Sequence, residues 1–173
     1  DGKAYRQRYE RGITKTDIEY LGETDKRGTT ITFLPDSTIF DDVDFNYTTI
    51  RHRMRELAFL NKGIKIILED KRSGAKDFFH YEGGIKEFVQ YLNNKKDFLH
   101  DEIIYSEGEK DKVIVEIALQ YTDSYTENIY SFVNNINTIE GGTHLIGFKT
   151  ALTRVVNDYA KKNNLIKEND VAI

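Results

Sequence analysis

The chain has 173 residues, 39% of them hydrophobic and 31% charged, which is typical of one globular domain and excludes a disordered or fibrous protein. Its formal net charge of −4 excludes a surface devoted wholly to nucleic acid but is compatible with a local basic face. The lack of cysteine excludes a disulfide framework or a thiolate metal site, and the lack of any long apolar run favours a cytoplasmic, non-membrane protein.

The first part of the chain is expected to form three strands. Tyr5 and Tyr9 alternate with polar residues over residues 4–12, which is typical of a half-buried strand. A second short strand fits residues 17–21, and residues 28–35 carry β-branched and aromatic side chains at alternate positions up to the chain's only proline. These patterns predict an antiparallel meander.

The next part is expected to form a helix, a hairpin and a second helix. Apolar residues recur at steps of three and four over residues 46–60, which is typical of an amphipathic helix. Strands fit residues 63–70 and 76–81, with turn-forming residues between them. The apolar spacing over residues 85–92 predicts the second helix.

The last part is expected to contain two longer strands and the longest helix. Alternation predicts strands over residues 113–121 and 127–134, and residues 161–173 are polar enough for a loop. Five apolar residues at helical spacing predict a helix of roughly five turns. They are Leu145, Phe148, Leu152, Val155 and Tyr159.

The order of these elements indicates the fold class. Runs of strands interrupted by helices that would cover one face of a sheet favour an α+β, two-layer sheet-and-helix domain over alternating βα units. Since the chain contains no linker, composition shift or internal repeat, we predict one domain over residues 1–173.

Patterns for catalysis or phosphate binding are weak. The sequence contains no glycine-rich phosphate loop, although the glycine pairs at 83–84 and 141–142 precede helices and could either bind an anion or serve backbone geometry. The four histidines have no metal-ligand spacing, and a pairing of His80 with Glu82 is more typical of a surface contact than of acid–base catalysis.

Basic residues gather on the long predicted helix. Residues 142–165 carry a local net charge of about +3 within an acidic chain. Lys149 follows Phe148, so it lies at the flank of the apolar stripe, where its ammonium can project into a groove. A second basic cluster, Arg51, Arg53 and Arg55, lies on the first helix. Either cluster is equally compatible with an ordinary solvated helix face.

Longer motifs follow one another along essentially the whole chain. They are residues 22–30 (GETDKRGTT), 33–36 (FLPD), 55–64 (RELAFLNKGI), 69–72 (EDKR), 79–85 (FHYEGGI), 127–138 (ENIYSFVNNINT) and 141–144 (GGTH). In this order they resemble the transducer region of the gyrase B family of bacterial type II DNA topoisomerases. The motif at 79–85 looks like the gyrase form rather than the topoisomerase IV form.

The resemblance implies a fold and a role. The family's transducer resembles the second domain of a small-subunit ribosomal protein, and it relays the ATP-driven closure of a preceding domain to the DNA gate. The family's ATP-binding residues precede the transducer and its nucleotide-sensing lysine follows, so we expect a C-terminally truncated transducer without its last strand and helix. In this chain we expect no catalytic, cofactor-binding or metal-binding residue, because ATP and Mg²⁺ would act in the full subunit.

The resemblance also implies partners and one DNA-contacting position. In the family, the basic residue after Gly-Phe in the helix following Gly-Gly-Thr-His faces the cavity that receives the transported DNA, and here it is Lys149. Some relatives have arginine there. We assign Lys149 and Arg154 as DNA-binding residues, with a gyrase A subunit and a second gyrase B protomer as protein partners. The alternatives are the equivalent segment of topoisomerase IV and a stand-alone α+β nucleic-acid-binding module.

Overall fold

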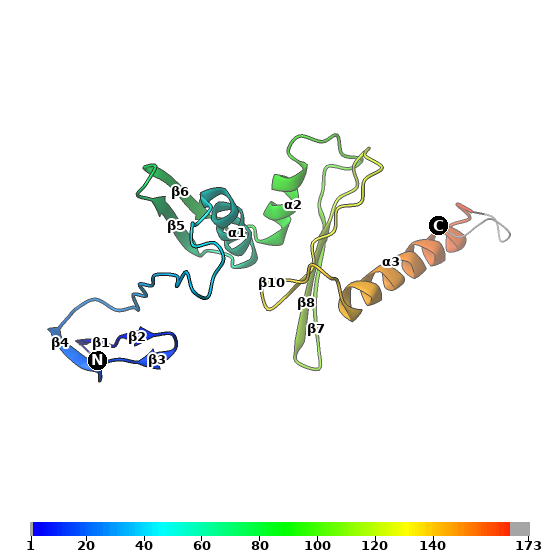
Figure 1. Ribbon diagram of the computed structural model, residues 1–173. Coiled ribbons are helices and arrows are strands. Elements are labelled where there is room, and N and C mark those ends of the chain that lie inside the picture. The colour runs from blue at the N-terminus through cyan, green and yellow to red at the C-terminus, as the bar shows by residue number, and fades with distance from the viewer. Residues whose placement is uncertain (1, 167–173) are drawn as a thin grey trace. The chain divides into compact units, whose positions relative to one another are not determined.

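A computed structural model describes residues 2–166 of the chain (Figure 1). The chain divides into two compact units, one that ends at Asn46 and one that begins at Tyr47. In the described residues, three helices are combined with strands that pair as two-stranded antiparallel sheets. The predicted α+β class is therefore confirmed in this coarse form.

The first unit is built from two short antiparallel pairs. Strand β1 (Lys3–Arg6) pairs with β4 (Glu19–Glu23), and β2 (Tyr9–Glu10) pairs with β3 (Ile13–Thr14). The turn between β2 and β3 contains Arg11 and Gly12, both in the left-handed region with φ of 49° and 78°. Two positive-φ residues are what a tight two-residue hairpin requires, so the strand predicted over residues 4–12 ends at this turn. It is also divided at residues 7 and 8, which separate β1 from β2.

The third predicted strand, over residues 28–35, is wrong. This segment has no regular secondary structure, and its apolar side chains are exposed, with 81% of Ile31, 71% of Phe33 and 92% of Leu34 accessible. Alternation gives a strand two distinct faces, but a strand also needs a neighbour for its backbone groups. The described residues provide no such neighbour for this segment.

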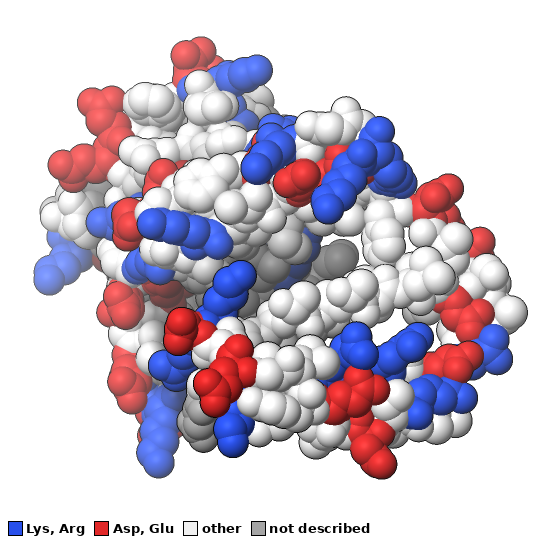
Figure 2. Space-filling view, turned by 90° about the vertical axis from the view of Figure 1, so that its left-hand side faces the viewer, with Lys and Arg blue, Asp and Glu red and all other residues white. Residues whose placement is uncertain are grey.

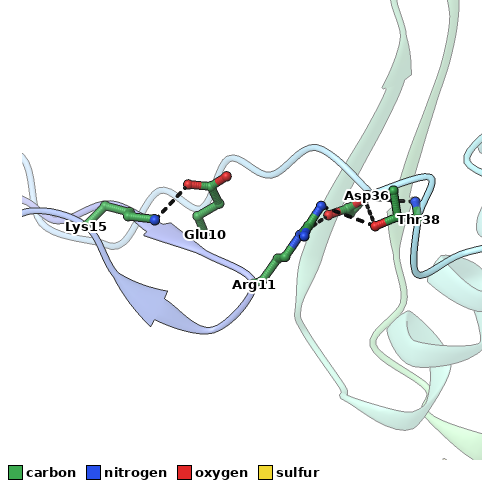
Figure 3. Close-up of polar contacts among 5 residues, drawn as sticks. All are labelled: Glu10, Arg11, Lys15, Asp36 and Thr38. Atoms are coloured by element: carbon green, nitrogen blue, oxygen red, sulfur yellow. Dashed lines mark hydrogen bonds and ion pairs between the residues drawn. The ribbon is translucent and has the colours of Figure 1, made fainter.

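A polar cluster joins the hairpin turn of the first unit to the segment that follows the proline (Figure 3). Asp36 accepts hydrogen bonds from the Thr38 hydroxyl at 2.7 Å, the Thr38 amide at 2.8 Å and Arg11 Nε at 2.5 Å. Arg11 also donates to the Thr38 hydroxyl at 3.2 Å. The two Thr38 hydrogen bonds, followed by the one from Arg11, lower the pKa of Asp36 to about 2.

We therefore expect the first unit to lose, at acidic pH, the stabilisation that this cluster provides. Because the Asp36 pKa is depressed, the stabilisation is fully present above about pH 4 and is lost as the pH falls toward about 2. A ¹³C NMR titration of the carboxyl group should give a midpoint near 2. Arg11→Ala should raise that midpoint only in part, since Thr38 still donates. A midpoint near 4 in the parent chain would contradict the assignment.

The core of the second unit lies between a helix, a hairpin and a second helix. Helix α1 (Tyr47–Leu60) packs on β5 (Lys65–Asp70) and β6 (Ala75–His80), and α2 (Ile85–Asn93) packs on α1. Each of these elements was predicted, with bounds within a few residues. Four apolar side chains fill the core because their periodic faces meet there. They are Ala58, Phe59, Phe79 and Phe88.

A charged junction ties the end of α1 to a second hairpin, β7 (Ile104–Lys110) and β8 (Val113–Leu119). Lys62 donates to Glu116 at 2.8 Å, and the Tyr105 hydroxyl donates to the same carboxylate oxygen at 2.7 Å. The hydrogen bond to Glu116 is the main reason that the pKa of Tyr105 rises to about 12. The Lys62 side chain crosses Gly84, where a Cβ would collide with it.

Two predictions for the last part need correction. Strand β8 was predicted, but its partner is β7, whose sequence IYSEGEK is too polar to have been recognised as a strand. The strand predicted over residues 127–134 is reduced to β9 (Phe132–Val133), which turns back onto β10 (Ile136–Asn137). Asn134 and Asn135 form that turn with φ of 48° and 64°, the conformation that asparagine tolerates best after glycine.

The long helix was predicted, and it spans α3 (Thr143–Lys162), further than the apolar stripe suggested. Leu145, Phe148 and Leu152 are partly buried, as expected. Val155 and Tyr159, however, are 59% and 63% exposed. Beyond Leu152 the less accessible apolar positions continue at steps of four instead of three. These positions are Val156 and Ala160.

The β7–β8 hairpin exposes apolar side chains on both faces. Val113, Ile114 and Val115 are 61%, 68% and 51% accessible. A two-stranded ribbon with open edges and exposed apolar faces is a template for pairing with another chain.

We therefore expect the isolated chain to self-associate as its concentration rises. Light scattering after size-exclusion chromatography over a hundredfold concentration range should show a rising mass. Ile114→Lys should weaken the association, because it places a charge on the ribbon. Ser124→Lys, which adds the same charge at an exposed loop position, should leave the association unchanged. A single monomeric mass at all concentrations would contradict the prediction.

Candidate nucleic-acid interface

Helix α3 carries both residues that the sequence assigned to DNA contact. The helix begins directly after Gly141 and Gly142, whose φ values of 77° and 153° are accessible to glycine at no steric cost. The Gly142 carbonyl accepts the amides of Leu145 and Ile146 at 3.1 Å, so it starts the helical hydrogen bonds. Lys161 and Lys162 lie in the last turn, where positive charge interacts favourably with the negative end of the helix dipole.

Lys149 and Arg154 lie on different sides of α3. They are five positions apart, which on an α-helix is a rotation of roughly 140° and a rise of roughly 7.5 Å. The Lys149 side chain is 50% exposed, and Arg154 is exposed without a polar contact to the described part of the chain. The two residues therefore form no single binding face on the helix, although each can meet an anion from solvent.

The structure gives Lys149 a partner that the sequence analysis did not identify. Its ammonium donates to Glu127 Oε1 at 2.5 Å, and the Glu127 side chain is 64% exposed. Glu127 belongs to the segment between β8 and β9, 22 residues upstream. No local sequence pattern predicts a pair over that separation, because periodicity relates only residues within one helix or strand.

The arginines of α1 are engaged within the second unit. Each donates to a group of another element or loop, and Arg55 also lies over the rings of Phe79 and Tyr91 at 5.6 and 5.0 Å. The acceptors are Asp77 for Arg51 at 2.8 Å, the Asn135 carbonyl for Arg53 at 2.8 Å and the Tyr91 hydroxyl for Arg55 at 2.5 Å. This cluster therefore packs the unit together, which neither sequence interpretation anticipated.

The wider surface does not form a continuous basic face in the view of Figure 2. Acidic and basic side chains are interspersed across the face shown there. This distribution agrees with the net charge of −4. On the face shown, a polyanion would meet single cations rather than a broad positive field.

The other candidate patterns have structural roles. The Gly83 amide, at the entry to α2, donates to the Glu87 carboxylate at 3.0 Å, so a side chain of the helix itself takes the place of an anion. His80 contacts Glu82 at 3.1 Å and the Ile64 carbonyl at 3.1 Å at the surface. Residues 2–166 contain no group of three or more His, Asp or Glu side chains that could hold a metal ion. No helix among them is long and apolar enough to cross a membrane.

Comparison with known proteins relates the whole chain to one family. A family model described as DNA gyrase B matches residues 84–173. The chain is 55% identical over 172 residues to the DNA gyrase B protein of Bacillus mycoides and 57% identical over 171 residues to that of Clostridium acetobutylicum. It covers 98% of itself in both cases but only 43% and 27% of those relatives, so it spans less than half of their length.

A solved structure agrees with the sequence matches. The 43K ATPase domain of Thermus thermophilus gyrase B, solved in complex with an aminocoumarin, is similar with a TM-score of 0.77 and 36% identity. The similarity covers 98% of this chain and 47% of that one. Family model, relatives and solved structure point to the same protein family. The chain belongs to the DNA gyrase B family.

Proposed function

We propose that this chain is the transducer segment of a bacterial gyrase B protein, and that it couples ATP-driven closure of that protein to the capture and passage of DNA. The observation that carries the proposal is the half-exposed Lys149 on α3, at the position after Gly-Phe that follows Gly-Gly-Thr-His. A lysine contacts phosphate as a point charge, without the bidentate fork of arginine. Such a contact is blind to sequence, which suits an enzyme that must pass any DNA.

The finer assignments belong to the same proposal. Both units, over residues 1–173, are parts of one two-layer transducer domain of the ribosomal-protein-like type. ATP and Mg²⁺ bind elsewhere in the complete gyrase B protein, so this segment by itself does not hydrolyse ATP. Its partners are DNA, a gyrase A subunit and a second gyrase B protomer, in the bacterial cytoplasm.

Two observations favour this proposal over the alternatives. The relatives reported above are gyrase B proteins, which favours gyrase over topoisomerase IV. The chain spans less than half of their length, which favours a part of a larger protein over a stand-alone nucleic-acid-binding module.

The proposal is tested in the complete gyrase B protein assembled with gyrase A. In the double variant Lys149→Ala/Arg154→Ala, DNA-stimulated ATP turnover and supercoiling should fall. Nucleotide-driven dimerisation of gyrase B and DNA-independent turnover should persist, because they depend on the nucleotide-binding part. Supercoiling and DNA stimulation at the parental level would show that these residues do not link DNA capture to closure.

A further inference from the structure

Lys149, the cation that the proposed function assigns to DNA, forms an ion pair with Glu127. The two charged atoms are 2.5 Å apart, and both side chains are at least half exposed. The pair is therefore accessible to an incoming polyanion. Arg154 lies on the same helix and has no such acidic partner among the described residues. Of the two assigned residues, only Lys149 is held by a carboxylate within residues 2–166.

We propose that Glu127 is a positioning residue that sets the affinity of the Lys149 site for DNA phosphate. This inference rests on the proposed function. The Glu127 carboxylate and a DNA phosphate are both anions that accept hydrogen bonds from one ammonium. A phosphate that arrives at Lys149 either displaces Glu127 or shares the lysine with a like charge at short range. Both routes lower the affinity, so Glu127 keeps the contact weak and reversible.

Exposure of the pair sets the size of the effect. Ion pairs between solvent-exposed side chains are weak, and breaking one corresponds to roughly a two- to fivefold change in an equilibrium constant. A phosphate can therefore displace the carboxylate readily. Weak retention suits a surface that must capture a DNA segment and then release it. Because Glu127 lies between β8 and β9 while Lys149 lies on α3, displacement also breaks this ion pair between that segment and the helix.

The first test is Glu127→Gln in the complete gyrase B protein assembled with gyrase A. Equilibrium binding of a short fluorescent DNA duplex should tighten about two- to fivefold at low salt. The difference should shrink at high salt, where exposed charges are screened. Asp123→Asn is the matched control, since it removes the same charge from the same exposed segment without a contact to Lys149. It should change the affinity less.

The second test shows whether Glu127 acts through Lys149. In a Lys149→Ala background, Glu127→Gln should have no further effect, because the residue that it positions is gone. Equal tightening in both backgrounds would mean general repulsion of DNA and would overturn the inference. If Lys149→Ala weakens binding but Glu127→Gln alone changes nothing, the inference is also wrong, while the proposed function stands. If neither variant changes binding, the proposed function itself fails.

Discussion

Replacing Phe59 by alanine is expected to lower the free energy of unfolding of the second unit by about 3–5 kcal/mol. Phe59 is 1% exposed, and its ring stacks on Tyr81 with centroids 3.7 Å apart and on Phe88 with centroids 5.0 Å apart. Deletion of the ring removes its burial and opens a cavity where α1, the end of β6 and α2 meet. It also removes three aromatic pairs, with Tyr81, Phe88 and Tyr91, which stabilise beyond the area that they bury.

Urea denaturation followed by circular dichroism measures this loss, and a second phenylalanine provides the control. Phe78 lies on β6 with 60% of its surface exposed, so Phe78→Ala deletes the same atoms with little cavity. It should cost less than about 1 kcal/mol. Phe59→Leu should fall between the two, since it keeps part of the volume and loses the stacking. Equal losses for Phe59→Ala and Phe78→Ala would contradict the assignment of the core.

The same core explains which parts of the fold could be predicted from the sequence. All three described helices and the hairpin β5–β6 were predicted. In each of them one face is buried, so apolar residues recur along the sequence at the spacing of a helix or a strand. Strand β7 was missed because most of its side chains stay exposed, so burial imposes no alternation on it. Residues 28–35 do have the alternation of a strand, but pairing is a non-local property that a single pattern cannot supply.

In the candidate site, too, local features could be predicted from the sequence and contacts between distant segments could not. Lys149 could be proposed as a DNA contact from its place beside Phe148 and from the resemblance. Both depend on residues that are close together in the sequence. Its ion pair with Glu127 joins two segments 22 residues apart and could not be predicted. Likewise, the positive charge on α1 resembled a binding cluster. The hydrogen bonds that engage Arg51, Arg53 and Arg55 become visible only once the hairpins and α2 are in place.

Loss of Lys149 is expected to lower the affinity for DNA and to make that affinity less sensitive to salt. If Lys149 neutralises one phosphate, Lys149→Ala should make the slope of log affinity against log salt shallower by about 0.9. Folding should change by less than about 0.5 kcal/mol, because a half-exposed side chain in a surface ion pair leaves no cavity. In the complete enzyme, DNA-stimulated ATP turnover and supercoiling should fall, while nucleotide-driven dimerisation persists.

Two further variants separate a phosphate contact from a general charge effect. Lys149→Arg keeps the charge and should retain most of the DNA stimulation and the parental salt slope. Lys110→Ala removes an exposed lysine from β7 instead of α3 and should leave both unchanged, since the effect depends on position and not on net charge. If Lys149→Ala behaves like Lys110→Ala across the salt titration, Lys149 is an ordinary surface lysine. The DNA path must then cross a different part of the gyrase B protein.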